Sequence, residues 1–305
     1  MKLNERNLQA LTSEQYILLG QEQYKQESIM QAITVEHLMS GTLIREGAGV
    51  KLMRYIGVTR GNDFDPILLF DYFDSHDPLD YIAGFPAHPH KGFETITYML
   101  QGRMQHKDNQ GHQGIIDAGD VQWMTAGRGI VHSEMPAQNE GHLAGVQLWL
   151  NLPAADKLCV PAYQEFVANQ LPIEALASGV IVKVIAGETE NATSPLSGVA
   201  TQPLFFDIQI PAQVPYHLSL PVSHRAIVFV LSGALQIGNQ TVNAKQLAIL
   251  SVGDDLTLQA KENDSACLLI AAKTLNEPIA RLGPFVMNTQ AEIQEALDDF
   301  RNNRF

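Results

Sequence analysis

The sequence FPAHPHKGFET occupies residues 85–95, and QWMTAGRGIVHSEMP occupies residues 122–136. These two stretches contain the pairs His88/His90 and His132/Glu134. Side chains alternate along a β-strand, so residues two positions apart point to the same face. Each pair is therefore predicted to present two polar groups on one face of a strand. Three imidazoles and one carboxylate form a ligand set for one divalent metal ion.

Short apolar runs separated by turns connect the two stretches. Residues 92–100 have the pattern of a strand, and Gln101-Gly102 interrupts it. Further glycine-containing turns follow at residues 109–111, 117–120 and 126–129. Several short strands joined by tight turns are typical of an antiparallel sandwich or barrel. We expect a small β-barrel with the four polar side chains directed inward.

The second half of the chain repeats this rhythm. VFVLSG at residues 228–233 is similar to TYMLQG at residues 97–102, and VGD at residues 252–254 is similar to AGD at residues 118–120. An internal duplication of one barrel is the simplest explanation. The histidines of this half, His217 and His224, are seven positions apart, so the second barrel is predicted to have no metal site.

The predicted fold class is all-β, with two tandem jelly-roll β-barrels, an N-terminal helical extension and a C-terminal helix. The extension is expected because Thr12-Ser13-Glu14-Gln15 resembles a helix-capping sequence ahead of an amphipathic run to about Ile33. The expected parts are an N-terminal helical extension at residues 1–40, a barrel with the metal site at 41–153, a linker at 154–171, a barrel without a metal site at 172–282, and a C-terminal tail with a helix at 283–305.

Composition excludes several classes of function. The net charge of −13 would repel the phosphate backbone, so we expect no direct binding of nucleic acid. Two cysteines, Cys159 and Cys267, are too few for a disulfide framework. No apolar run approaches the roughly 20 residues that cross a bilayer. The sequence predicts a cytoplasmic protein without a membrane partner.

Other polar and aromatic residues near the motifs are interpreted more simply. His106 and His112 are predicted to be exposed on a polar hairpin. Arg128 is predicted either to line a pocket or to stabilise its turn. Phe85, Phe93 and Met135 stand next to the proposed ligands and would provide the apolar rim of a site for an aromatic substrate.

Taken together, the two quoted stretches resemble the pirin family of the cupin superfamily. The similarity extends from about Asp65 to Phe305 and includes GPFVMNT at residues 283–289. The general cupin motifs match His88, His90, Glu94 and Gly102, followed by Gly119-Asp120 and His132. The resemblance implies a bicupin with one metal site.

The choice of the carboxylate ligand rests on this resemblance. Glu94 is separated from His88 and His90 by an even number of positions, as residues on one strand face are. Alternation alone therefore does not decide between Glu94 and Glu134 as the ligand. Pirins carry a carboxylate two residues after the last histidine, which favours Glu134. Glu94 would then orient a ligand or hold a proton near the substrate. The resemblance favours Fe(II), and the same ligands also suit Mn, Co, Ni, Cu or Zn.

Two functions are consistent with a pirin-like site. The first is a metal-dependent dioxygenase resembling quercetin 2,3-dioxygenase, which opens the ring of a flavonol-like aromatic substrate with O2. In this hypothesis Glu134 or Glu94 accepts the hydroxyl proton. The second is a regulatory protein that senses metal or redox state and binds a protein partner, either a transcription factor or a metabolic enzyme.

Overall fold

The structure is a computed structural model that describes residues 30–58 and 64–305. The helix predicted at residues 12–33 lies outside these residues except at its end. Residues 30–33 are not helical, and Ala32 forms a parallel bridge to Asp255. Residues 32–305 make up one compact unit.

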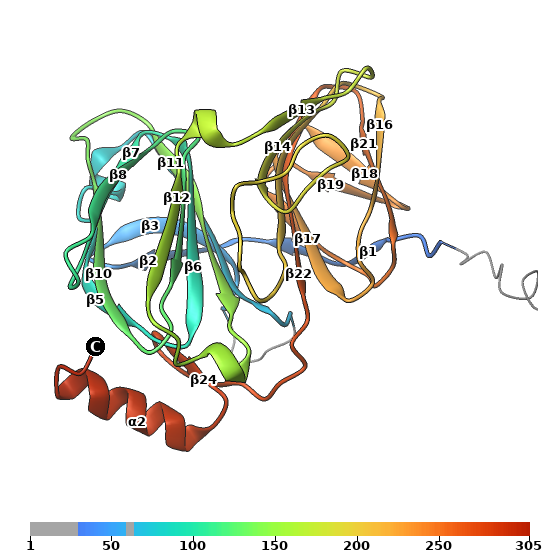
Figure 1. Cartoon of the computed structure of the whole chain (residues 1–305). Coiled ribbons are helices and arrows are strands. Elements are labelled where there is room, and N and C mark those ends of the chain that lie inside the picture. The colour runs from blue at the N-terminus through green and yellow to red at the C-terminus, as the bar shows by residue number, and fades with distance from the viewer. Residues whose placement is uncertain (1–29, 59–63) are drawn as a thin grey trace, which may run out of the picture. The chain divides into compact units, whose positions relative to one another are not determined.

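Over the described residues, the first barrel consists of an antiparallel sheet of seven strands and one of four (Figure 1). In spatial order, the strands of the larger sheet are β12 (Ala162–Phe166), β9 (Val121–Thr125), β6 (Phe93–Gln101), β11 (Leu143–Asn151), β4 (Ile67–Ser75), β3 (Val50–Ile56) and β2 (Thr42–Glu46). Those of the smaller sheet are β5 (Phe85–His90), β10 (Ile130–Pro136), β7 (Arg103–Asp108) and β8 (Gln113–Asp117).

The second barrel has the same plan over the described residues. In spatial order, the strands of its larger sheet are β1 (Val35–Ser40), β20 (Gln246–Leu250), β17 (His224–Ser232), β22 (Ser265–Lys273), β15 (Leu204–Ile210), β14 (Ile181–Ala186) and β13 (Ile173–Ala175). Those of its smaller sheet are β16 (Pro215–Ser219), β21 (Asp255–Ala260), β18 (Ala234–Ile237) and β19 (Gln240–Asn243). The all-β prediction of two tandem barrels is confirmed.

Two edge strands depart from the expected domain boundaries. Strand β1 lies in the part of the sequence expected to be an N-terminal extension, but it pairs with β20 and completes the second barrel. Strand β12 lies in the expected linker and pairs with β9 of the first barrel. Both strands cover what would otherwise be a free edge of a large sheet, where unpaired backbone groups are available.

The interiors of the two barrels differ in polarity. In the second barrel, Val228 and Val230 of β17 point into an apolar core. In the first barrel, Thr97 of the corresponding strand β6 points inward and donates to Glu134. Strand β10 presents His132 and Glu134 where the corresponding strand β21 presents Leu256 and Leu258. The first barrel therefore has a polar interior in a position that the second barrel fills with aliphatic side chains.

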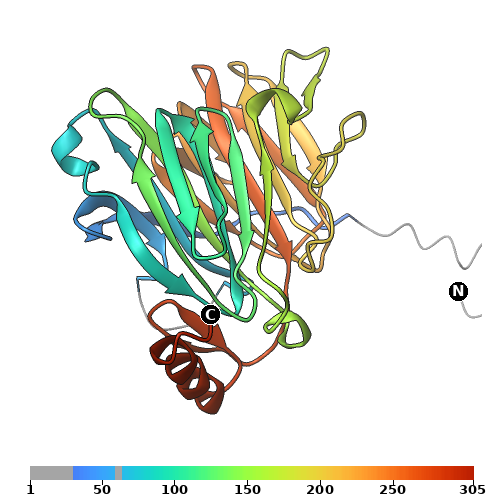
Figure 2. The ribbon, with the colours of Figure 1, turned by 60° about the vertical axis from the view of Figure 1, so that its left-hand side comes forward.

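The outer faces of the two large sheets share one apolar cluster, and Figure 2 shows the sheets side by side. Trp123 and Phe70 of the first barrel and Phe229 of the second belong to this cluster. The Phe70 and Phe229 ring centroids lie 5.1 Å apart, within the range of favourable aromatic pairs. This cluster is continuous across the two barrels.

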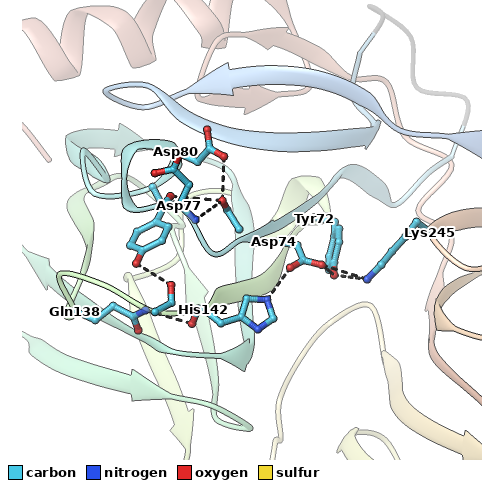
Figure 3. A network of polar contacts seen from close by, with 10 residues as sticks. Tyr72, Asp74, Asp77, Asp80, Gln138, His142 and Lys245 are labelled. Carbon is cyan, nitrogen blue, oxygen red and sulfur yellow. Dashed lines mark hydrogen bonds and ion pairs between the residues drawn. The ribbon is translucent and has the colours of Figure 1, made fainter.

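A polar network lies at one end of the same junction (Figure 3). Lys245 of the second barrel donates to the hydroxyl of Tyr72, which in turn donates to Asp74. Asp74 also accepts from His142 Nε2 at 2.7 Å. Lys245 adopts a φ of 63°, in the left-handed region that is uncommon for a lysine. The network adds charged contacts to the apolar junction.

After the second barrel, the chain returns to the first one. Strands β23 (Ala280–Leu282) and β24 (Phe285–Met287) form a hairpin, and helix α2 (Gln290–Arg301) follows, which confirms the predicted C-terminal helix. Thr289 and Glu292 form a capping box at its start. Short 3₁₀ helices occur at Pro78–Asp80, Ala154–Asp156 and Ala168–Gln170. No helix among the described residues is long and apolar enough to cross a membrane.

A buried lysine joins the C-terminal hairpin to the first barrel. Lys157 is 1% exposed, and its Nζ donates to Gly92 O at 2.8 Å, Asn151 Oδ1 at 2.6 Å and Val286 O at 3.0 Å. Burial lowers its pKa to about 8. The three oxygens come from parts of the chain that are far apart in sequence, so this side chain fixes the hairpin against the strand that follows His90.

We predict that Lys157→Met lowers the free energy of unfolding by about 2–4 kcal/mol, because it leaves several buried oxygens without a donor. Urea unfolding measures the effect, and Lys273→Met, which changes an exposed lysine, is the matched control. Equal stability of the two variants would show that the buried contacts do not hold the hairpin.

Candidate metal site in the first barrel

The two histidine-containing motifs lie on adjacent strands of the four-stranded sheet. Strand β5 pairs with β10 so that His88 stands opposite His132 and His90 opposite Ile130. Strand β5 is an edge strand, where Pro86 and Pro89 are tolerated although they donate no backbone hydrogen bond. This pairing brings both motifs to one face of one sheet.

Three imidazoles converge inside the barrel. The ligand atoms of His88, His90 and His132 all lie within 4.8 Å of one another. Their ring centroids are 4.5–5.0 Å apart. His90 is 2% exposed and His132 is 1% exposed. The histidines predicted from the sequence to act together are thus brought together.

The hydrogen bonding of these rings suits a metal ion. His88 Nδ1 lies 2.8 Å from Pro86 O and donates to it, which leaves Nε2 as the free ligand atom. His90 Nδ1 and both ring nitrogens of His132 are buried without a hydrogen-bond partner among the described residues. Buried polar atoms without a partner are costly, and coordination of a cation would satisfy them. The donor set therefore fits a divalent transition metal.

Burial also favours the neutral form of two of the three rings. Burial, reinforced by the neighbouring histidines, lowers the pKa of His90 and of His132 well below the ordinary range. Neutral imidazoles offer the lone pair that a metal requires, so no proton has to be displaced at neutral pH.

Glu134 lies on the same face of β10 as His132 and is 2% exposed. Its Oε1 accepts from Thr97 Oγ1 at 2.9 Å, and its Oε2 accepts from Gln147 Nε2 at 3.4 Å. It does not belong to the group of three ligands within 4.8 Å. Glu134 lines the same cavity as His88 and His90, which places its carboxylate beside the histidines.

A cavity of about 540 Å³ opens next to the histidines. Its apolar walls include Phe85, Leu69 and Trp149, and its polar walls include Arg54, Asp71 and Arg281. Trp149 also contacts the ring of His90, with centroids 5.2 Å apart. A cavity of this volume, mostly apolar with a few polar groups, is typical of small-molecule sites.

The structure does not bring Glu94 to the histidines. Strand β6 is in the other sheet, and Gly92, with φ of 86°, redirects the chain between His90 and Glu94. Alternation along β5 is therefore not carried into β6. Thr97 faces Glu134, whereas Glu94 points to the opposite face and accepts from Thr125 Oγ1 at 2.7 Å. Although Glu94 is an even number of positions from His88 and His90, its side chain does not lie on the same face as theirs.

Sequence reasoning missed one histidine of the interior. The prediction that His106 is exposed is wrong, because it is 1% exposed on the inner face of β7, opposite Glu134. Its Nε2 lies 2.8 Å from Glu165 Oε1. A Cβ at Gly114 would lie 2.5 Å from the same nitrogen, so this glycine leaves room for the ring. The signal in the sequence is apolar Met104 two positions earlier, which shares a strand face with His106, and both are buried in β7.

Of the other residues predicted to lie near the site, only Phe85 lines the cavity, and the others lie in different environments. Phe85 lines the cavity as expected. Phe93 is fully buried beneath His90, and Met135 packs against Gly84. Arg128 is exposed, and its backbone N–H donates to Cys159 O.

Glu94 should make stability depend on pH. Burial raises its pKa to about 7, above the value of about 4.3 for an unfolded chain. Its stabilising contribution is present below pH 4.3 and is lost as the pH rises through 7. We predict that Glu94→Gln becomes more stable relative to the parent by about 2 kcal/mol between pH 5 and pH 8.

Urea unfolding with a chelator present measures this difference without interference from a metal. Glu262→Gln, which changes an exposed glutamate, is the control and should show no such trend. A Glu94→Gln difference that stays constant between pH 5 and pH 8 would contradict the assignment of a buried, raised-pKa carboxyl.

Comparison with known proteins agrees with this architecture. The sequence pattern of the family described as Pirin matches residues 49–150, and that of the Pirin C-terminal cupin domain matches residues 205–305. A pirin-like protein of Caulobacter vibrioides is 45% identical over 269 residues, covering 88% of this chain and 97% of the relative.

Solved structures show the same similarity. The crystal structure of a quercetin 2,3-dioxygenase from Acinetobacter baumannii has a TM-score of 0.83 at 35% identity, and the match covers 90% of this chain and 99% of that protein's chain. The Escherichia coli pirin YhhW, solved in complex with nickel(II), shares the fold with a TM-score of 0.61 at 20% identity, covering 79% of this chain and 99% of its own. The chain has two barrels and a histidine cluster in the first of them, and these matches show that it belongs to the pirin family.

Proposed function

We propose that the protein is a pirin-like, metal-dependent dioxygenase that opens the ring of a flavonol-like aromatic substrate with O2. The observation that carries this proposal is the convergence of three imidazoles within 4.8 Å of one another, two of them buried with unpartnered nitrogens, beside a cavity of about 540 Å³ that His88, His90 and Glu134 line. The resemblance to the Acinetobacter baumannii quercetin 2,3-dioxygenase supports the same chemistry.

In this proposal His88, His90 and His132 hold the metal, and Glu134 is the fourth ligand. Iron as Fe(II) is the preferred metal, and Mn, Co, Ni, Cu or Zn suit the same donors. When bound, such a metal supplies a Lewis acid and, in the case of iron, one-electron chemistry with dioxygen. Glu94 is left out of this proposed ligand set, because it accepts from Thr125 Oγ1 on the face of β6 opposite to that of Thr97.

The chain's own residues position the substrate and move its proton. The cavity wall formed by Phe85, Leu69 and Trp149 packs against the flat rings and excludes water. Glu134 accepts the proton of the substrate hydroxyl, because its carboxylate borders the cavity. Thr97 and Gln147 each donate to one of its oxygens and hold it in place.

We predict that iron-loaded protein consumes quercetin aerobically and that Glu134→Gln lowers kcat by about 100-fold or more, because the amide cannot accept the proton. Absorbance of quercetin and uptake of oxygen report turnover, and the metal content of the variant is measured in parallel. Lack of turnover by the parent protein with iron, nickel, manganese, cobalt, copper or zinc would contradict the proposal.

We also predict that His88→Ala abolishes stoichiometric metal binding, because the cluster loses one of its three imidazoles. The barrel should remain folded, because His88 is only half-buried. Elemental analysis gives the metal content, and far-UV circular dichroism gives the fold. His217→Ala changes an exposed histidine of the second barrel and should retain one metal per chain. Equal metal content in both variants would place the metal elsewhere.

A regulatory role, in which the site senses redox state and a partner protein responds, is favoured by one contact. Lys91, next to His90, forms an ion pair of 2.6 Å with Asp299 on α2. A change at the metal would reach the surface of α2 through this pair. Absence of turnover, combined with hydrogen exchange of α2 that differs between Fe(II) and Fe(III) protein, would favour this role over the enzyme.

A further inference from the structure

The wall of the cavity includes an arginine that comes from outside the first barrel. Arg281 lies on β23, after the whole of the second barrel, and pairs with Val286 in the hairpin. It lines the cavity together with His88, His90 and Glu134. The C-terminal hairpin thus contributes a cationic side chain to the proposed site.

The guanidinium of Arg281 is oriented by the cavity wall. Its Nη1 donates to Leu68 O at 3.1 Å. Its Cζ lies 4.9 Å from the centroid of the Trp149 ring, within the range of a cation–π contact. Trp149 in turn contacts the ring of His90. Arg281 and the histidine cluster therefore flank the same indole.

No carboxylate within the described ranges 30–58 and 64–305 forms an ion pair with Arg281. The other arginine of the cavity differs in this respect. Arg54 donates to both oxygens of Asp71, at 2.8 and 2.7 Å, and to Glu46 at 2.9 Å. Arg54 has its anionic partners already. A guanidinium has five N–H donors, and Arg281 makes one hydrogen bond, to Leu68 O, among the described residues.

The backbone around Arg281 is held firmly against the first barrel. Val286 N donates to Lys91 O at 3.0 Å, and Lys91 N donates to Pro284 O at 3.3 Å. Lys157 fixes the carbonyl of Val286 from the other side. Burial also lowers the pKa of Arg281, which reflects incomplete hydration of its charge. A poorly hydrated, preorganised guanidinium gains more from an anion than one exposed to water.

We infer that Arg281 is the anion-binding residue of this cavity and that the preferred substrate carries an acidic group in addition to its chelating oxygens. The inference rests on the proposed function in one respect, that the substrate occupies this cavity with its chelating end at the histidines. A carboxylate and an ionised phenol share the required chemistry, since each accepts charge-assisted hydrogen bonds from a guanidinium.

The test compares matched ligands by binding alone. Nickel(II)-loaded protein without oxygen is titrated with 3-hydroxyflavone, with its 3′- and 4′-carboxylate derivatives, and with its 4′-hydroxyl derivative above and below the pKa of that phenol. The chelating unit is the same in all of them, so differences in the dissociation constants report the added acidic group. Absorbance of the flavone gives the dissociation constants.

We expect at least one acidic ligand to bind the parent protein more tightly than 3-hydroxyflavone. Arg281→Gln should weaken that ligand by about 10- to 100-fold and 3-hydroxyflavone by less than about threefold. Arg281→Lys should recover part of the loss, because it keeps the charge but not the planar fork. Arg128→Gln, at an exposed arginine outside the cavity, should change neither constant.

Equal weakening of acidic and neutral ligands by Arg281→Gln, no weakening of either, or no binding of any acidic ligand to the parent protein would overturn the inference. Selective weakening in a protein that never turns over a flavonol in air would instead contradict the proposed oxygenase and leave the role of Arg281 intact. The two failures are thus distinguishable.

Discussion

The antiparallel pairing of β5 with β10 is the constraint on which the candidate site depends. It places His88 opposite His132, and alternation along each strand then directs His90 and Glu134 to the same interior. A register shift of one residue would turn these side chains to the outside. The remaining features, including the polar interior, the cavity and the hydrogen bonds to Glu134, are arranged around these two strands.

The two barrels show how one architecture supports or excludes a site. Corresponding strands occupy the same places in their sheets, but Leu256 and Leu258 fill the second barrel where His132 and Glu134 stand in the first. The aliphatic interior is packed and contributes to stability, whereas the first barrel contains polar groups whose burial is costly unless they are paired. The second barrel and the C-terminal hairpin then support the first from outside.

The histidine cluster and the duplicated barrels could be predicted from the sequence, because strand alternation and turn residues are local signals. Glu94 could not be placed in this way, because Gly92 moves the chain from one sheet to the other and interrupts the alternation. The pairing of β1 with the second barrel and the position of Arg281 depend on contacts between segments about 200 residues apart. Such contacts leave no periodic pattern, and the family resemblance indicated neither.

Crystals of the purified protein can show by anomalous scattering, at the absorption edges of iron, nickel and the other candidate metals, whether the histidine cluster of the first barrel holds a metal ion. We expect one strong peak per chain, bounded by His88, His90, His132 and Glu134, and no peak inside the second barrel. A peak that Glu94 contacts, a peak in the second barrel, or metal-replete crystals with no peak at the three histidines would contradict it.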